Sequence, residues 1–386
     1  MEHAASGPAG PAAGAVAGLP AAPSVFGPPA IDCDVHVAVP SVKTLLPYLD
    51  DYWRDQFLTR GIDRISWNMT GDPPNAPISA RPDWRPQAGK PGTDLDLLRG
   101  ALDAFGSSAA IANCIYGGAA LHSEDMAAAV CRAVNDWIVK EWLDREPRLS
   151  ASIVVPLGSP ELAVEEIERR AGDRRFVQVL LLAMGEVLLG RRHHWPIYAA
   201  AERHGLPIGV HAGSTYHHPT LAGGWGSHFI EDYVAQAFGF ENQVLSLVSE
   251  GVFAKFPSLK FVLIESGATW LPPALWRFSK TWRGTRAEIP WVKRKPSEIV
   301  RDNIRLTVQP FDAPDGAARL ERIVEQLGSD RMLLFSSDFP HWHYEGTDAL
   351  PVAPSSPLAQ RILFDNPVET YPRLKVPPAR EKETLS

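Results

Sequence analysis

The sequence has few cysteines, no long hydrophobic run and no excess of basic residues. Its three cysteines, Cys33, Cys114 and Cys131, are an odd number without the spacing of a metal-binding motif. This argues against a disulfide-based scaffold and favours a reducing compartment, so we expect a cytoplasmic protein. No run approaches the roughly 18 apolar residues of a membrane-spanning helix. The formal net charge of -7 offers no basic surface to nucleic acid. A small molecule is therefore the expected partner, with no nucleic acid and no membrane.

The ends of the chain and one internal stretch differ in composition from the rest. Residues 1–29 are almost entirely Ala, Gly and Pro without a basic segment, which we interpret as a disordered leader rather than a signal peptide. Residues 30–375 are expected to form a single domain, and residues 376–386 a flexible tail. Residues 65–93 are rich in Pro, Trp and Asn, which indicates a long insertion loop. This loop is expected to cover the site or to contact a second subunit, and a homodimer or a larger homo-oligomer is predicted.

Between these regions, short apolar runs alternate with amphipathic stretches. The runs predict strands at 30–37, 109–116, 149–155, 176–182, 207–211, 259–265, 303–308 and 332–335. The stretches predict helices at 41–59, 95–105, 123–146, 159–171, 196–204, 230–253, 271–286 and 315–327. Alternation of this kind is typical of parallel strands joined by right-handed crossovers. Eight such units predict an α/β fold, a distorted TIM-like (β/α)8 barrel.

Several of the predicted strands end in groups that bind metals. Asp34 and His36 are two residues apart on the first strand and therefore point to the same face. The fifth strand ends in His211, the sixth in Glu265, and Asp338 follows the eighth. Because the carboxyl ends of barrel strands meet at one mouth, these side chains are expected to converge. Two imidazoles with carboxylates suit one divalent metal per chain, with zinc expected and manganese or iron as alternatives.

Five stretches then resemble a known family. They are DCDVH at 32–36, GLPIGVHAG at 205–213, FPSLKFVLIESGATWLPPALWR at 256–277, LLFSSDFPHW at 333–342 and RILFDNPVETY at 361–371. Their order and spacing resemble the metal-dependent amidohydrolase superfamily, in its amidohydrolase-related branch, which is similar to aminocarboxymuconate-semialdehyde decarboxylase. The resemblance implies a mononuclear metal in a distorted barrel. It makes Asp34, His36, His211 and Asp338 the metal ligands, with Asp338 also a candidate proton carrier.

The sequence departs from the family pattern at two positions. Asp34 stands where many relatives have the first histidine of a His-x-His pair, and a carboxylate there suits manganese as well as zinc. Glu265 stands where the decarboxylases have a histidine that takes part in proton transfer. Glu265 would act as a general acid or base if burial raises its pKa, or coordinate the metal, or anchor an arginine such as Arg277. His341, next to Asp338, is the first choice to replace the missing histidine as proton donor.

Six further residues are candidates for substrate binding. Aromatic and imidazole side chains near the mouth would form walls for a planar substrate, and an arginine would bind a substrate carboxylate through a bidentate fork. Each is also compatible with a structural role on a surface or in the core. The candidates are Trp225, Trp270, His218, Arg283, Trp342 and His343.

Three functions are compatible with this site. The first is non-oxidative decarboxylation of a small aromatic or unsaturated carboxylic acid, which branch membership favours. The second is attack by a metal-bound hydroxide on an amide, a lactone or a carbon–carbon bond, which the absence of the sixth-strand histidine favours. The third is a non-catalytic binding protein, against which the retained metal donors argue. We therefore expect an enzyme, a metal-dependent carboxy-lyase or hydrolase of the amidohydrolase superfamily.

Overall fold

The computed structural model describes residues 29–65, 79–221, 223–312, 317–341, 350 and 355–375. Residues 1–28 of the expected leader and the whole expected tail lie outside these ranges. So do residues 66–78 of the expected insertion, and with them Trp342 and His343. Among the described residues, no helix combines the length and the apolar character needed to cross a membrane.

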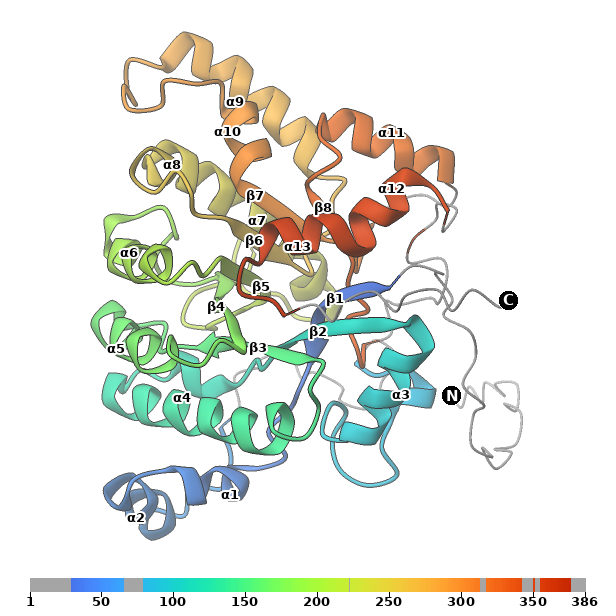
Figure 1. Cartoon of the computed structure of the whole chain (residues 1–386). Coiled ribbons are helices and arrows are strands. Elements are labelled where there is room, and N and C mark those ends of the chain that lie inside the picture. Colours follow the sequence, from blue (N-terminus) through green and yellow to red (C-terminus); the bar gives the residue numbers. More distant parts are fainter. Residues whose placement is uncertain are drawn as a thin grey trace, which may run out of the picture.

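Eight parallel strands form one sheet in which every strand pairs with its neighbours in sequence. They gather at the centre of the molecule with helices around them (Figure 1). The sheet closes because the segment after the last strand pairs with the first, through the Cys33 N–H to Phe335 O bond of 2.9 Å and the His36 N–H to Phe339 O bond of 2.7 Å. The predicted (β/α)8 barrel is confirmed. The strands are β1 (Ala30–His36), β2 (Ser107–Asn113), β3 (Leu149–Val154), β4 (Phe176–Met184), β5 (Ile208–Ser214), β6 (Phe261–Ile264), β7 (Ile304–Thr307) and β8 (Leu333–Leu334).

Helices follow the strands and cover the outside of the sheet. The α-helices are α1 (Val42–Leu45), α2 (Asp51–Thr59), α3 (Leu95–Phe105), α4 (Glu124–Ile138), α5 (Pro160–Arg170), α6 (Trp195–Arg203), α7 (Phe229–Ser249), α8 (Val252–Lys255), α9 (Leu271–Thr285), α10 (Pro296–Asn303), α11 (Ala317–Leu327), α12 (Pro357–Gln360) and α13 (Asn366–Thr370). Shorter turns are the 3-10 helices η1 (Leu46–Tyr48), η2 (Pro82–Trp84), η3 (Gly117–Ala120) and η5 (Arg192–His194), and the π-helices η4 (Val139–Leu143) and η7 (Arg361–Asp365).

Local sequence explains where α3 begins and ends. The Asp94 side chain accepts hydrogen bonds from the backbone N–H groups of Asp96 and Leu97 at the amino end. This satisfies two donors that have no partner within the helix. At the other end, Gly106 adopts φ 62°, a left-handed conformation that glycine tolerates without a steric penalty. Asp94 and Gly106 therefore define the two ends of the helix through local interactions.

Helical segments differ from the prediction at four places. The expected helix 41–59 is divided into α1, η1 and α2, with Pro47 in the first turn of η1. The expected helix 230–253 is interrupted at Gly251, where φ is 83°. No element was predicted for 296–302, where α10 begins with Pro296, or for 357–370, where α12, η7 and α13 lie. Their mixed polar and apolar sequences show little periodicity, and their packing against the barrel defines them.

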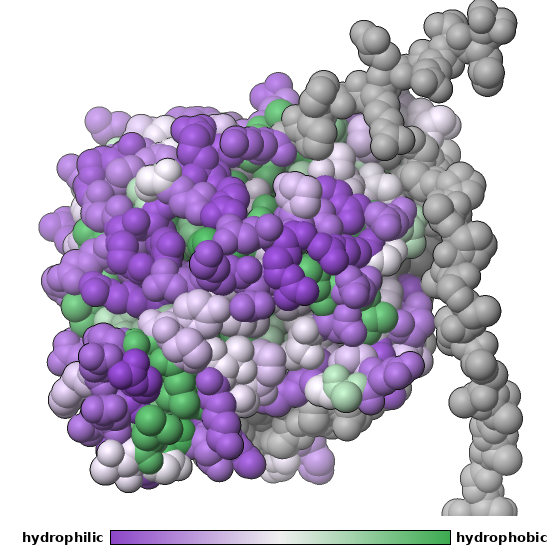
Figure 2. Space-filling view, turned by 60° about the horizontal axis from the view of Figure 1, so that its bottom comes forward, coloured by the Kyte–Doolittle hydropathy of each residue, from purple (hydrophilic) through white to green (hydrophobic). Residues whose placement is uncertain are grey.

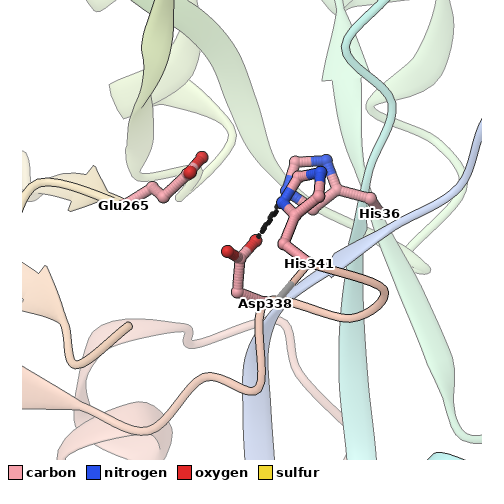
Figure 3. Close-up of side chains that lie close together, drawn as sticks. All are labelled: His36, Glu265, Asp338 and His341. Atoms are coloured by element: carbon pink, nitrogen blue, oxygen red, sulfur yellow. Dashed lines mark hydrogen bonds and ion pairs between the residues drawn. The ribbon is translucent and has the colours of Figure 1, made fainter. Parts of the chain in front are cut away.

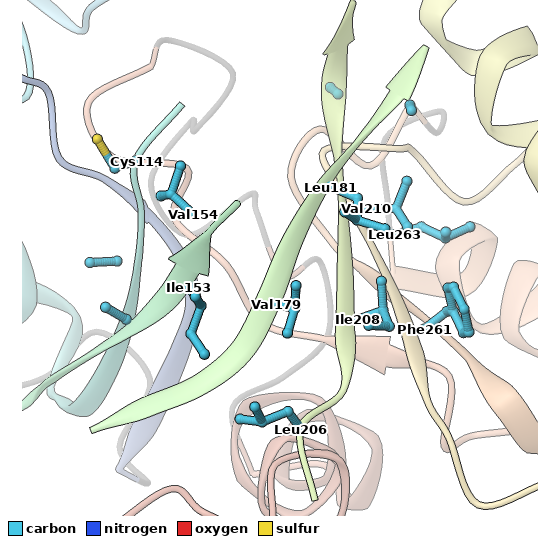
Figure 4. Packing of buried hydrophobic residues seen from close by; sticks show 14 of the residues in the cluster. Cys114, Ile153, Val154, Val179, Leu181, Leu206, Ile208, Val210, Phe261 and Leu263 are labelled. Carbon is cyan, nitrogen blue, oxygen red and sulfur yellow. The ribbon is translucent and has the colours of Figure 1, made fainter. Parts of the chain in front are cut away.

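Two apolar layers hold the barrel together. The outer layer lies between the sheet and the helices, and Figure 4 shows its side chains on adjacent strands, such as Val179, Val210 and Leu263. The inner layer fills the barrel and includes Ile111 and Tyr371. Strands buried on both faces explain why the sequence reads as continuous apolar runs rather than as an alternation.

The described end of the insertion is packed rather than peripheral. Trp84, in η2, is buried and its ring lies 5.2 Å from that of Phe339, just after β8. The Arg81 N–H donates to the Pro340 carbonyl at 2.8 Å. This end of the expected 65–93 insertion therefore packs against the segment that follows β8. Most side chains on the face in Figure 2 are hydrophilic, with one group of hydrophobic ones at its lower left.

Candidate metal centre

A β-bulge in β1 directs Asp34 and His36 into the barrel mouth. Asp32 and Val35 lie opposite Ala110 and Ala112 of β2, so β1 contains one extra residue. Because of this insertion, Asp32 does not share the face of Asp34 and His36. Its Oδ1 instead accepts from the Asp34 N–H at 3.2 Å and the Ser337 N–H at 2.9 Å. Asp32 thus supplies acceptors to backbone groups that the bulge leaves without a ladder partner.

The other candidate donors come from the carboxyl ends of three further strands. His211 lies within β5, Glu265 directly follows β6, and Asp338 lies in the segment after β8 that pairs with β1. Glu265 and Asp338 have φ values of 63° and 55°, a left-handed conformation that is uncommon for residues other than glycine. Such strained positions cluster at functional sites, where the surrounding structure holds them.

The structure brings the predicted donors together, and Figure 3 shows three of them, His36, Glu265 and Asp338, with His341. His36 Nε2 lies 3.0 Å from Asp338 Oδ1 and 3.8 Å from Asp34 Oδ1. His211 Nε2 lies 3.6 Å from the same Asp34 oxygen. Donor atoms of Asp34, His36 and His211 are all within 4.8 Å of one another, and so are those of His36, Glu265, Asp338 and His341. His36 belongs to both groups, so one ion has access to donors from each.

The donor set fits a divalent cation. Asp34, His211 and Asp338 are completely buried, and His36 is 8% exposed. The second carboxylate oxygens of Asp34 and Asp338 and the Nε2 atoms of His36 and His211 find no hydrogen-bond partner among the described residues. Buried polar atoms without partners are costly unless another group binds them. Two carboxylates and two imidazoles are the ligands that zinc, manganese and iron accept.

A backbone carbonyl fixes the orientation of one candidate imidazole ligand. His211 Nδ1 lies 2.8 Å from the Ala212 carbonyl oxygen, which can only accept a hydrogen bond. The Nδ1 atom therefore carries a proton, and Nε2, which faces Asp34, is the nitrogen left to bind a cation. Metal-binding histidines typically use this arrangement, in which the second nitrogen donates to an oxygen of the protein.

Burial and charge give the two acidic side chains opposite protonation states. Burial, followed by the negative charge of Asp338, raises the pKa of Glu265 to about 8. Burial also opposes ionisation of Asp338, but His341 and His36 outweigh it and hold its pKa well below the usual range. For His341, burial lowers the pKa, but the Asp338 carboxylate at 2.8 Å outweighs this and raises it to about 10. Near neutral pH, Glu265 carries a proton and Asp338 is an anion paired with His341.

Tyr233 binds Glu265, and sequence reasoning missed it. Its hydroxyl donates to Glu265 Oε1 at 2.9 Å, and the Glu265 N–H donates to Thr307 Oγ1 at 2.9 Å. Arg277, the arginine named as an example for the anchoring alternative, is exposed on α9, whereas the described partners of Glu265 are Tyr233, Thr307 and His211. Tyr233 lies in the second turn of α7, where no local motif distinguishes it from a packing residue.

Asn113 binds Asp34, and sequence reasoning missed this residue as well. Its Nδ2 donates to Asp34 Oδ1 at 2.8 Å, while its Oδ1 accepts from Ser152 and from Gln178. Gln178 in turn accepts from the Tyr371 hydroxyl at 3.2 Å. These buried side chains form a continuous network through the barrel that fixes the rotamer of a metal donor. A polar residue inside the second predicted strand, 109–116, was the available signal.

The predicted substrate-binding residues lie in different places. Trp270 is partly buried, and its indole N–H donates to the Ser266 carbonyl at 2.8 Å. His218 Nδ1 lies 2.9 Å from the Pro219 carbonyl, Trp225 is 50% exposed, and Arg283 is exposed in the last turn of α9. None of these four has a described contact with the metal donors. Trp342 and His343 lie outside the described residues.

The amino-acid sequence is similar to a known protein family and to characterised members of it. A model of the family described as Amidohydrolase matches residues 31–373. The gamma-resorcylate decarboxylase of Polaromonas sp. is 27% identical over 223 residues, which are 54% of this chain and 65% of that enzyme. The alignment therefore covers less than two thirds of that relative.

Solved structures have the same fold. An amidohydrolase of Mycobacterium avium subsp. paratuberculosis has a TM-score of 0.65 and 22% identity, over 89% of this chain and 98% of that one. A dihydroxybenzoic acid decarboxylase of Polaromonas sp. has a TM-score of 0.62 and 19% identity, over 90% of this chain and 98% of that one. At 22% and 19% sequence identity, these matches show that the chain shares the fold of those proteins.

Proposed function

The chain belongs to the amidohydrolase family, and we propose that it catalyses the metal-dependent, non-oxidative decarboxylation of a small aromatic carboxylic acid. The observation that carries this proposal is the buried set of two carboxylates and two imidazoles with unpartnered atoms, beside a carboxyl group that keeps its proton near neutral pH. The relative named gamma-resorcylate decarboxylase supports the reaction type. The Polaromonas structure, which contains manganese and the inhibitor 2-nitroresorcinol, supports an aromatic substrate.

We propose Asp34, His36, His211 and Asp338 as the ligands of one metal ion, zinc in the first instance, with manganese or iron as alternatives. When bound, the ion would attract the substrate carboxylate and an adjacent oxygen and stabilise negative charge there. The hardness of two carboxylate ligands suits manganese as well as zinc. Metal content by mass spectrometry distinguishes these ions.

Glu265 is the proposed proton donor. In the reaction the ring carbon that carries the carboxylate gains a proton, the bond to the carboxylate breaks, and carbon dioxide leaves. The donor must hold a proton at the working pH and lie beside the metal ligands, and Glu265 meets both conditions because its Oε2 lies 3.7 Å from His211 Nδ1. Tyr233 binds the other oxygen and holds the carboxyl in place. His341 is assigned a different role from that expected, because its proton is shared with Asp338 and keeps that ligand ionised.

Hydrolysis of an amide, a lactone or a carbon–carbon bond is the second candidate. It is favoured by the presence of a carboxyl group, rather than a histidine, at the end of β6, since a carboxylate can also accept a proton from water. In that case Glu265 would act as a base, and activity would rise rather than fall as it ionises. The pH dependence of turnover therefore separates the two candidates.

The proposal is tested on purified protein with measured metal content. Hydroxylated benzoic acids are assayed for carbon dioxide release, and then amides and lactones for hydrolysis. We expect release of carbon dioxide that requires about one divalent ion per chain and is absent in Asp338→Asn. If the metal-loaded protein releases carbon dioxide from none of these acids and hydrolyses an amide or a lactone, decarboxylation is rejected in favour of the second candidate.

Three further features are also proposed: a homodimer, a reducing location and two aromatic contacts to the substrate. A homodimer is supported by Ile230, Val234 and Phe238, three exposed apolar residues at four-residue spacing on one face of α7. Sedimentation of the protein and of Phe238→Lys tests this. A reducing, cytoplasmic location is supported by the three buried free cysteines. Trp270 and Trp225 are proposed to contact substrate from the loops near the mouth.

A further inference from the structure

A second cavity, of about 300 Å³, lies at the same end of the barrel as the metal donors and contains none of them. Its walls come from the segments that follow β2, β3, β4 and β5. Active sites of such barrels are built from these connections. The volume is at the lower end of the range for small-molecule sites. Wall residues that the following paragraphs use are His122, Leu157, Gly158, His194, Thr215 and His217.

Two stacked imidazoles contribute to the wall of this cavity. The rings of His122 and His217 lie 3.7 Å apart at an interplanar angle of 14°. His122 follows β2 and His217 follows β5, so the pair joins two connections across the mouth. In strand order, the ends of β3 and β4 lie on one side of this pair, and β6, β8 and β1 lie on the other. Flat aromatic rings therefore form part of the cavity wall.

Two polar atoms in the cavity wall lack partners. Thr215 Oγ1 and His194 Nδ1 are buried and have no hydrogen-bond partner among the described residues, and the two residues are 8% and 6% exposed. His194 Nε2 lies 3.3 Å from the Val187 carbonyl, so that nitrogen carries the proton and Nδ1 is an acceptor. Burial lowers the pKa of His194 to about 4, which keeps the ring neutral. A ligand with a hydroxyl or amino donor would satisfy these atoms.

Apolar side chains, among them Leu157 and Leu182, line part of the cavity, and Glu124 and Glu186 also border it. The apolar side chains and the stacked imidazoles suit a flat ring, and the two carboxylates disfavour an anionic one. A ring that also provides one hydrogen-bond donor matches both kinds of wall. Phenols are the simplest molecules of this class.

The position of the cavity relates it to the metal centre. Thr215 lies four residues beyond His211, and the register of β5 is irregular between them, so their separation along the chain is up to roughly 13 Å at about 3.3 Å per residue. A single benzoic acid bound through its carboxylate at the metal donors would not span this distance. A longer acid would place its remote end at the cavity.

We propose that this cavity is a binding site for a phenol-like ring, and that the ring is the remote part of an aromatic acid whose carboxylate lies at the metal donors. The second half of this inference rests on the proposed function, whereas the first half does not. The substrate class is accordingly an aromatic acid joined by a short linker to a second, phenolic ring.

The binding half is tested with 4-methylphenol as the probe, by ligand-observed NMR titration of the metal-loaded protein. Gly158→Leu is expected to abolish binding, because a Cβ at Gly158 meets no atom within 4 Å and a larger side chain would enter free space at the wall. Thr215→Val is expected to weaken binding about tenfold through loss of one hydrogen bond. Thr220→Val is the matched control, since its buried hydroxyl also lacks a partner but borders a different cavity. Absence of binding, or equal affinity in Gly158→Leu and Thr220→Val, would overturn the inference.

The substrate half is tested with two acids that differ only in the linked phenolic ring. The longer acid is expected to have the higher kcat/KM, and this advantage is expected to disappear in Gly158→Leu while the shorter acid is unaffected. If 4-methylphenol binds as expected but neither acid releases carbon dioxide, the proposed function fails and the binding site stands. If both acids react equally well in wild type and Gly158→Leu, the cavity is not part of the substrate site.

Discussion

Replacing Glu265 by glutamine tests the proposed proton donor directly. Glutamine keeps the size of the side chain and an oxygen that can accept from the Tyr233 hydroxyl, but it has no acidic proton. We expect kcat for decarboxylation to fall by a factor of about 10² to 10⁴, the usual contribution of a general acid. In the wild type, the rate should fall as the pH rises through an apparent pKa at or below about 8, since a bound cation favours the carboxylate. This alkaline limb should be absent in Glu265→Gln.

The same substitution has a predictable effect on the stability of the metal-free protein. Because the folded state raises the pKa of Glu265 from 4.5 to about 8, it keeps a proton that the unfolded chain loses above pH 4.5. Wild-type stability therefore decreases between about pH 4.5 and 8, and Glu265→Gln lacks this contribution. At about 1.36 kcal/mol per pKa unit, the upper limit of the difference is about 5 kcal/mol. Urea unfolding at pH 5 and pH 8.5 measures it.

Glu288→Gln is the control, because Glu288 is exposed after α9 and its replacement changes the same functional group away from the site. Wild-type turnover in Glu265→Gln, with its alkaline limb intact, would refute the assignment and make His341 the donor. A difference in unfolding free energy that does not grow with pH would show that Glu265 titrates normally in the folded protein.

Four further outcomes are expected. Asp338→Asn and His211→Ala should each abolish turnover and reduce the bound metal measured by mass spectrometry, and full activity in either would remove the site assignment. Asn113→Ala should weaken metal binding about 10- to 100-fold in a chelator competition, because it frees Asp34 to rotate; unchanged affinity would mean that packing alone orients the ligand. Asp32→Ala should destabilise the protein by about 1–3 kcal/mol in urea unfolding, through two backbone donors left without their acceptor, and a smaller effect would show that water replaces it. Metal affinity measured by calorimetry should increase from pH 6.5 to about 9. Burial lowers the pKa of His211, but the negative charge of Asp34 outweighs this effect and raises that pKa to about 9. The ion must therefore displace a proton from His211 over this pH range. A flat pH profile would show that His211 is already neutral.

Much of the fold could be predicted from the sequence because barrel strands are buried on both faces. Each therefore appears as a short apolar run between helical stretches, and each of the eight predicted runs overlaps a strand of the sheet. The candidate metal donors could also be predicted from the sequence, because parallel strands in a closed barrel end at one mouth. Segments whose position depends on packing, such as α10 and the buried Trp84, gave no comparable signal.

The sequence by itself determined which side chains lie at the ends of the strands. Chain order gives their positions, and the two-residue period of a β-strand gives which of them share a face. Tertiary structure alone decided how those groups ionise and which partners hold them. Asn113 reaches Asp34 from 79 residues away, and Tyr233 reaches Glu265 from 32. A pKa depends on burial and on charges that the fold brings near, whatever their separation along the chain. For the same reason the cavity that His122 and His217 border exists only in the folded molecule, where the connections after β2 and β5 meet.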